Sequence, residues 1–309
     1  MSELRSLLVA MAAISFLLGF PATGSADTSL SEGQSGGVYY ESYGGGVKLT
    51  GDIQLPENAT GKHPAIILVH GSDGIGYREA TWGRFFRENG YVTMVIDMFG
   101  PRNFTRMSGP NVGGYDDVFD AFNVLKTHPN VDPDQISVMG WSWGAGIALS
   151  SASHTKGRGE GHVLKSIVSF YPVCGLSAIP VTGNKDTEIL LVVGTKDTYS
   201  KDWQCKEVVE KGRRDGRKAR LIVYEGAYHG FDNDKNETFT HRKFGQQEIR
   251  ADYGIAEQAH KDVLDFLKSV GTELGVALKT DNSTSGSAGE KPEACKTKAY
   301  SDLFPDQCS

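Results

Sequence analysis

The sequence predicts an α/β fold in which helices cover both faces of a mostly parallel central sheet. The first observation is a set of short apolar runs that are rich in Val and Ile and lack polar alternation. Such runs are typical of strands buried on both faces. The second observation is that segments with helical periodicity separate these runs. This alternation predicts βαβ units with right-handed crossovers.

Six runs are predicted to form the parallel strands: Ala65–His70, Val92–Asp97, Ile136–Gly140, Ser166–Tyr171, Ile189–Gly194 and Arg220–Tyr224. The segment Gly45–Leu55, which precedes them, is predicted to be an antiparallel edge strand. The helices predicted after individual strands are Glu79–Asn89, Tyr115–His128, Gly144–Ser153 and Ser200–Arg213. A last helix, Ile255–Val270, is expected to end at Gly271, because glycine suits the left-handed turn that ends many helices.

Both ends of the chain differ in composition from this pattern. Residues 1–26 are typical of a secretory signal peptide: Arg5 is followed by the apolar run Leu7–Phe20 and by the small residues 24–26. The run is shorter than the ~20 residues needed to span a bilayer, so no stable membrane span is expected. One large α/β domain is predicted to cover residues 27–280. Residues 281–309 are predicted to form a flexible linker and a tail. We therefore expect a secreted or periplasmic protein.

Charge and cysteine content narrow the possible partners. The 309-residue chain has a net charge of −6, which argues against a nucleic-acid partner. Its four cysteines suit disulfides in an exported protein, although four cysteines permit three pairings. Cys295 and Cys308 lie close together in the tail and are expected to pair, which leaves Cys174 with Cys205. No metal site is expected, because the cysteines form no C-x-x-C pair and have no nearby histidine.

The segment Gly140-Trp141-Ser142-Trp143-Gly144 has the pattern of a nucleophile elbow. It joins a predicted strand to a predicted helix, and a side chain at either glycine would collide with the neighbouring strand or helix. With 38 glycines in the chain the pattern arises readily by chance. The surrounding sequence therefore has to decide whether Ser142 is a catalytic nucleophile. A serine in such a turn is by itself usually a turn residue.

Asp197 and His229 supply that context. Each follows a predicted strand, and the order Ser142, Asp197, His229 is the chain order of α/β-hydrolases. Taken singly, the aspartate could be a helix cap and the histidine a surface residue. Together they predict a Ser-His-Asp triad on an α/β-hydrolase fold. Asp202 and Asp232 are alternatives for the carboxylate, but neither immediately follows a predicted strand.

Backbone N–H groups near Ser142 are expected to bind the oxyanion. One is the N–H of Trp143, directly after the nucleophile. The second should come from the glycine-rich loop after the first parallel strand, where Ser72 and Asp73 are equal candidates. His70, at the start of this loop, is expected to be structural.

Three further residues are candidates for contact with substrate. Trp141 and Trp143 flank the nucleophile and either pack against sheet and helix or form an aromatic wall for an acyl group. Arg102 follows another strand end, where it could bind a substrate carboxylate or form a salt bridge within the protein. The polar segment Phe231–Tyr253 has few structural signals, and a loop of that length is usually functional or mobile.

Over roughly residues 40–270 the chain resembles the dienelactone hydrolase family of α/β-hydrolases. The resemblance rests on the elbow and on three strand-end segments, 97–102, 194–197 and 228–231. It implies hydrolysis of small esters or lactones through a covalent acyl-enzyme, without a cofactor. The enzyme that names the family has a Cys nucleophile, where this chain has Ser142, and a Glu after the first parallel strand, which the loop His70–Gly76 lacks.

A third departure concerns the substrate. Of the family's two carboxylate-binding arginines, Arg102 matches one, whereas the other position lies within Phe231-Asp232-Asn233. A neutral or hydrophobic carboxylic ester is therefore the expected substrate. The alternatives are a polyester or peptide hydrolase with the same triad, and a non-catalytic binding domain on a hydrolase scaffold. The oligomeric state stays open.

Overall fold

The computed structural model describes residues 30–42, 46–105, 114–153, 163–180 and 182–270. The predicted signal peptide, the linker, the tail and the Cys295–Cys308 pairing lie outside these residues. Within the described ranges, no helix is both long enough and apolar enough to cross a membrane.

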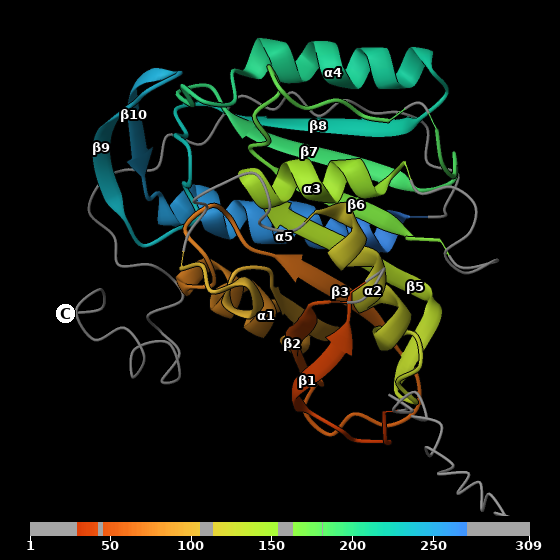
Figure 1. Cartoon of the computed structure of the whole chain (residues 1–309). Coiled ribbons are helices and arrows are strands. Elements are labelled where there is room, and N and C mark those ends of the chain that lie inside the picture. Colours follow the sequence, from red (N-terminus) through yellow and green to blue (C-terminus); the bar gives the residue numbers. More distant parts are fainter. Residues whose placement is uncertain (1–29, 43–45, 106–113, 154–162, 181, 271–309) are drawn as a thin grey trace, which may run out of the picture.

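An eight-stranded sheet forms the centre of the molecule (Figure 1), with strand order β1-β2-β4-β3-β5-β6-β7-β8. The strands are β1 (Gly36–Glu41), β2 (Lys48–Gln54), β3 (His63–Val69), β4 (Val92–Asp97), β5 (Val131–Trp141), β6 (Ser166–Phe170), β7 (Glu188–Gly194) and β8 (Lys218–Tyr224). The strands from β4 to β8 in this order pair in parallel, whereas β2 pairs antiparallel with both β1 and β4. The mostly parallel sheet predicted from the sequence is confirmed.

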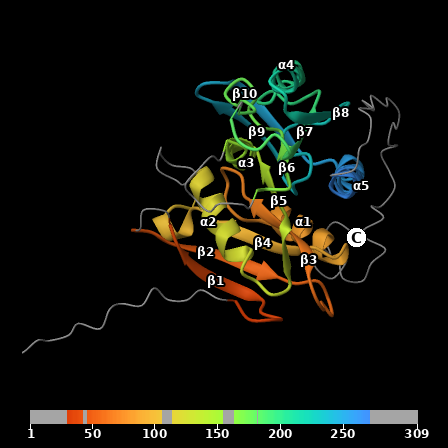
Figure 2. The ribbon, with the colours of Figure 1, turned by 90° about the vertical axis from the view of Figure 1, so that its right-hand side faces the viewer.

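Helices cover both faces of the sheet, as predicted (Figure 2). The helices are α1 (Tyr77–Glu88), α2 (Tyr115–Leu125), α3 (Trp143–Ser151), α4 (Asp202–Arg214) and α5 (Tyr253–Ser269), and a short 3-10 turn, η1, spans Gly100–Arg102. Side chains of α1 and α5 pack on one face, and those of α2, α3 and α4 on the other.

The apolar core follows from the two-residue period of the strands. In β3, Ile66 and Leu68 pack with α1 and α5, whereas Ile67 and Val69 pack with α2 and α3. All four side chains are fully buried. A strand covered on both faces needs apolar residues at every position, which is why these strands lack polar alternation in the sequence.

Two expectations about strands were wrong. The predicted edge strand is β2, which is antiparallel but lies between β1 and β4, so that β1 forms the sheet edge. The segment Phe231–Tyr253, expected to be a loop, contains a two-stranded antiparallel sheet of β9 (Asn236–His241) and β10 (Gly245–Arg250). In Figure 1 this hairpin lies beside the carboxyl ends of the parallel strands.

A disulfide joins Cys174, in the segment after β6, to Cys205 in α4. Both cysteines are buried. The bond ties together two segments that follow neighbouring strands at the same edge of the sheet. The other two cysteines lie in the part of the chain that is not described.

Candidate active site

Ser142 lies in the tight turn between β5 and α3. Its backbone has φ 51° and ψ −112°, a strained conformation that recurs at functional sites. A Cβ on Gly140 would lie 2.3 Å from the carbonyl oxygen of Gly144, and a Cβ on Gly144 would lie 2.3 Å from the carbonyl oxygen of His70. The turn therefore requires glycine at both positions. The Ser142 N–H donates to the carbonyl of Phe170 at the end of β6, at 2.9 Å.

The three residues of the predicted triad meet at the carboxyl edge of the sheet. His229 Nε2 lies 2.9 Å from Ser142 Oγ, and His229 Nδ1 lies 2.8 Å from Asp197 Oδ2. Because an ionised carboxylate only accepts hydrogen bonds, Nδ1 carries the proton and Nε2 is free to accept from the serine hydroxyl. The arrangement can therefore remove a proton from Ser142.

Asp197 is held by its own loop. Its Oδ1 accepts hydrogen bonds from the backbone N–H groups of Tyr199 and Ser200, at 2.8 and 2.7 Å, which leaves Oδ2 to face the histidine. Its side chain is fully buried. Of the alternative carboxylates, Asp202 pairs with Lys206 on α4, and Asp232 lies in a separate buried cluster.

Aromatic rings pack against the imidazole. The ring centroid of His229 lies 4.6 Å from that of Tyr171 and 4.8 Å from that of Tyr199. Burial raises the pKa of Tyr199 to about 12, so its phenol stays neutral. Tyr199 also contacts three half-buried rings of the β9–β10 hairpin, those of Phe239, His241 and Phe244.

These hairpin rings were not identified from the sequence. The only available signal was the presence of aromatic residues within an otherwise polar segment. The hairpin is fastened to both neighbouring loops: Thr198 Oγ1 donates to Gln247 Oε1 at 2.7 Å, and His229 forms a β-bridge with Ile249. It therefore places an apolar surface beside the Ser142 site.

Of the two predicted sources of oxyanion donors, one directly follows Ser142 and the other follows the end of β3. Trp143 is the first residue of α3, so its N–H has no acceptor within the helix. The Gly71–Gly74 turn after β3 holds Ser72 and Asp73. The Asp73 carboxylate accepts a hydrogen bond from Arg78 at 2.8 Å.

His70, Trp141 and Trp143 make hydrogen bonds or packing contacts within the protein. Nδ1 of His70 lies 2.8 Å from the Gly71 carbonyl oxygen, and Nε2 accepts the Met98 N–H at 3.2 Å, so both ring nitrogens have backbone partners. Trp141 is fully buried and packs between sheet and α1. Trp143 is half-buried, with its ring centroid 5.2 Å from that of Phe99.

Arg102 forms a salt bridge within the protein. Its guanidinium donates to both carboxylate oxygens of Asp117, at 2.8 and 2.9 Å, and to the carbonyl of Met98 at 3.0 Å. Burial raises the pKa of Asp117, an effect opposed by the hydrogen bonds from Arg102. Arg102 was considered either as a ligand for a substrate carboxylate or as a partner in a salt bridge within the protein. Its contacts are those of the salt bridge.

Asp232 forms a buried cluster that sequence reasoning did not find. Its Oδ2 accepts from the indole N–H groups of Trp82 and Trp141, at 2.9 and 2.8 Å, and its Oδ1 accepts from the Tyr171 hydroxyl at 2.6 Å. Burial raises the pKa of Asp232, whereas Arg78 and the three hydrogen bonds oppose that shift. No local pattern could have revealed it, because Trp82 is 150 positions away.

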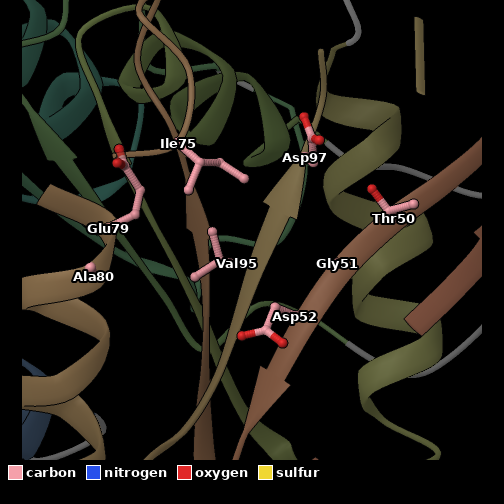
Figure 3. Close-up of a pocket in the computed structure, with 8 residues that line it drawn as sticks. All are labelled: Thr50, Gly51, Asp52, Ile75, Glu79, Ala80, Val95 and Asp97. Atoms are coloured by element: carbon pink, nitrogen blue, oxygen red, sulfur yellow. The ribbon is translucent and has the colours of Figure 1, made fainter. Parts of the chain in front are cut away.

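A cavity of about 350 Å³ lies elsewhere, between the start of α1 and strands β2 and β4. Figure 3 shows its lining: Thr50, Gly51, Asp52, Ile75, Glu79, Ala80, Val95 and Asp97. Two of its carboxylates are engaged by backbone, since Glu79 accepts the Gly76 N–H and Asp97 accepts those of Phe99 and Gly100. Ser142 and His229 do not line it. Among the described residues, no group of three or more His, Cys, Asp or Glu side chains is placed to hold a metal ion.

Comparisons with known proteins bear on the family and the fold of the chain. A model of the dienelactone hydrolase family matches residues 49–271. Thermogutta terrifontis esterase 2, solved in a form phosphorylated by paraoxon, is 20% identical, with a TM-score of 0.56 over 77% of this chain and 94% of that one. A dienelactone hydrolase-like promiscuous phosphotriesterase from metagenomic libraries is 16% identical, with a TM-score of 0.58 over 77% and 99%. At these identities the two structures share the fold.

The thiohydrolase aneE of Aspergillus aculeatus is 30% identical over 118 residues. That match covers 36% of this chain and 35% of the thiohydrolase. The chain thus spans about a third of the length of this relative.

Proposed function

Because the chain belongs to the dienelactone hydrolase family, we propose that it is a serine hydrolase that cleaves carboxylic esters or lactones through an acyl-enzyme on Ser142. The observation that carries this proposal is the chain of two hydrogen bonds from Ser142 through His229 to Asp197, at 2.9 and 2.8 Å. A nucleophile, a base and a carboxylate that orients the base are what acyl transfer by serine requires.

In the proposed reaction, His229 Nε2 takes the hydroxyl proton as Ser142 Oγ attacks the ester carbonyl. The tetrahedral intermediate expels the alcohol, which receives that proton from His229 and leaves an ester on Ser142. Water then attacks this ester, with His229 again as base, and His229 returns the proton to Ser142 Oγ as the acid is released. Asp197 stays ionised throughout and stabilises the imidazolium. No cofactor takes part.

The oxyanion is proposed to lie between the N–H of Trp143 and an N–H of the Gly71–Gly74 turn. Ser72 and Asp73 are the two candidates in that turn. The start of α3 adds the positive end of a helix dipole, although this helix of nine residues is short.

The proposed substrate is a neutral or hydrophobic ester. Arg102 is engaged by Asp117, and the segment after His229 holds Asp232 and Asn233, which offer no cation for a substrate carboxylate. The hairpin rings around Tyr199 offer apolar contact instead. We therefore expect p-nitrophenyl butyrate to be cleaved with a higher kcat/KM than a succinate monoester of the same alcohol.

The protein is proposed to act outside the cytoplasm. A signal peptide over residues 1–26 would direct export, and the buried Cys174–Cys205 disulfide is of the kind that persists in an oxidising compartment. Mass spectrometry of the protein from an exporting host should find the mature chain beginning at residue 27. A mature chain that retains residues 1–26 would contradict this assignment.

The test of the activity compares wild type with Ser142→Ala on short-chain nitrophenyl esters, simple lactones and a thioester. Wild type should turn over esters or lactones, whereas Ser142→Ala should not. Paraoxon should add one phosphoryl group to Ser142 of wild type and none to the variant. Absence of turnover above that of Ser142→Ala would overturn the proposal.

Two results would favour the alternatives. Release of soluble acids from a polyester film, or cleavage of peptides, with poor turnover of small esters would assign the same triad to a polymer. Failure of paraoxon to label folded wild type would favour a binding domain on a hydrolase scaffold.

A further inference from the structure

The mechanism above leaves one buried carboxylate near Ser142 without a role. Asp232 is 4% exposed and accepts three side-chain hydrogen bonds, from Trp82, Trp141 and Tyr171. All three donors are fully buried. An ionised carboxylate in such surroundings is costly to desolvate, and buried ionic groups can often be replaced by apolar ones without loss of stability.

Two of these donors adjoin the triad. Trp141 is the last residue of β5 and directly precedes Ser142. The position of its indole therefore affects the position of the strained turn at Ser142. Tyr171 directly follows β6, and its ring centroid lies 4.6 Å from that of His229. Tyr171 has φ 38°, which is strained for a residue with a side chain, and such strain persists only where surrounding contacts enforce it.

The cluster also extends toward the oxyanion turn. The guanidinium of Arg78, a buried residue, lies 5.9 Å from the centroid of the Trp141 ring and attracts the Asp232 carboxylate. Arg78 also donates to Asp73 in the Gly71–Gly74 turn, at 2.8 Å. Asp232 is therefore connected to the elbow through Trp141, to the residue that packs on His229, and through Arg78 to the Gly71–Gly74 turn.

We propose that Asp232 is a positioning residue of the Ser142 site, whose carboxylate holds the elbow and the ring of Tyr171 in the arrangement needed for transfer to and from Ser142. The proposal rests on the hydrolase function proposed above. Small displacements of reacting groups cost large factors in rate. A fixed anion with three donors and a neighbouring guanidinium resists such displacements in a way that an apolar contact does not.

The test compares variants of the three residues that donate to Asp232. The donor far from the triad is the control for the two donors beside it. Tyr171→Phe and Trp141→Phe each remove one hydrogen bond to Asp232 from a residue beside the triad. Trp82→Phe removes an equivalent hydrogen bond from α1, away from the triad, and deletes the same side-chain atoms as Trp141→Phe does. Asp232→Ala removes the carboxylate, whereas Asp232→Asn keeps an acceptor for the indoles and an amide to which the Tyr171 hydroxyl can turn.

Each variant is measured for Tm, for kcat and KM per labelled active site, and for the rate of phosphorylation by paraoxon. Asp232→Ala should lower kcat about a hundredfold, and Tyr171→Phe and Trp141→Phe about tenfold, with KM within about twofold of wild type. Trp82→Phe should lower Tm as much as Trp141→Phe does but leave kcat within about twofold. Asp232→Asn should regain most of the kcat that Asp232→Ala loses.

A role in stability alone makes a different prediction. The Trp82 and Trp141 variants would then lose Tm together, and the folded, labelled fraction of every variant would have the kcat of wild type. That result would overturn the proposal. If wild type reacted with paraoxon but cleaved no ester, the proposed substrate class would fail, whereas the phosphorylation rates of the variants would still test Asp232.

Discussion

At the scale of single residues, the Ser142 turn depends on contacts that leave no room for side chains. The backbone of Ser142 is strained, at φ 51°, and the two flanking glycines lie against carbonyl oxygens of the next helix and of the end of β3. Strain of this kind has to be maintained by the surrounding structure. The glycines therefore contribute to the site by the absence of a Cβ.

Gly144→Ala should destabilise the fold and disable the site. Its Cβ would lie 2.3 and 2.4 Å from the carbonyl oxygens of His70 and Val69, which belong to backbone and must move. Overpacking of this kind costs about 3 kcal/mol at the upper end of its usual range. Urea unfolding should find that loss, and ester turnover should fall at temperatures where the variant is still folded.

The matched control lies two residues further along α3. A Cβ on Gly146 would meet its nearest neighbour, Ser177 Oγ, at 3.4 Å, which is ordinary contact. Gly146→Ala should therefore gain up to ~1 kcal/mol from the higher helix propensity of alanine. Equal stabilities for the two variants would contradict the steric account of the elbow.

At the scale of elements, α5 contains a half-buried histidine, His260, that makes the fold sensitive to acid. The ring centroid of His260 lies 4.0 Å from that of Trp82 and 4.5 Å from that of Phe85, and among the described residues its buried Nε2 has no hydrogen-bond partner. Burial lowers the pKa of His260 from 6.5 to about 4. The folded state therefore favours the neutral imidazole.

This shift predicts a loss of stability on acidification. Below pH 6.5 the unfolded chain takes up a proton at His260 that the folded protein does not accept until about pH 4. The free energy of unfolding should thus fall by about 2 kcal/mol between pH 7 and pH 5 from this group alone. Urea unfolding of wild type and His260→Phe at both pH values should give a smaller fall for the variant. An equal fall in both would contradict the assignment.

The sequence analysis missed the β9–β10 hairpin as well as the edge strand β1. The strands of the hairpin are mostly exposed and polar, and an isolated two-stranded hairpin buries too few residues to leave a clear alternating pattern. Long-range contacts hold the hairpin in place, such as the hydrogen bond from Thr198 to the fully buried Gln247. These contacts join residues 49 positions apart and are invisible to a local pattern.

Gln247→Ala should loosen this hairpin. The substitution removes the bond from Thr198 and the bond of the Gln247 amide to the Phe244 carbonyl, at 2.7 Å. Losing such bonds costs about 1 kcal/mol each, so the backbone amides of β9 and β10 should exchange with deuterium faster than in wild type. Gln246→Ala, at the exposed neighbouring position, should leave exchange unchanged. Unchanged exchange in both variants would mean that the hairpin is fastened by other contacts.

At the scale of the whole molecule, the topology explains how much could be predicted. The carboxyl ends of parallel strands meet at one edge of the sheet, so residues that follow successive strands become neighbours whatever their separation. This rule was enough to place Ser142, Asp197 and His229 together from the sequence. It could not supply the partner of Arg102 or the cluster around Asp232, since both depend on which side chains of separate helices and loops meet.

The same topology gives the Cys174–Cys205 disulfide its effect. The bond closes a loop across 31 positions that contains β7 and Asp197. In the chain-entropy model a loop of this size stabilises the fold by about 3.5 kcal/mol, because it restricts the unfolded chain. Unfolding by urea with and without a phosphine reductant should find a loss of this order on reduction, provided that the buried bond is reduced before the measurement.

Two variants separate this bond from the cysteines of the tail. Cys174→Ala/Cys205→Ala should have the lower stability already and should not respond further to reductant, whereas Cys295→Ala/Cys308→Ala should keep the full response. Because Asp197 lies inside the closed loop, the first variant should also lose ester turnover at a lower temperature than wild type. If the tail variant lost the response instead, the stabilising bond would lie in the tail and not between the two segments that follow β6 and β7.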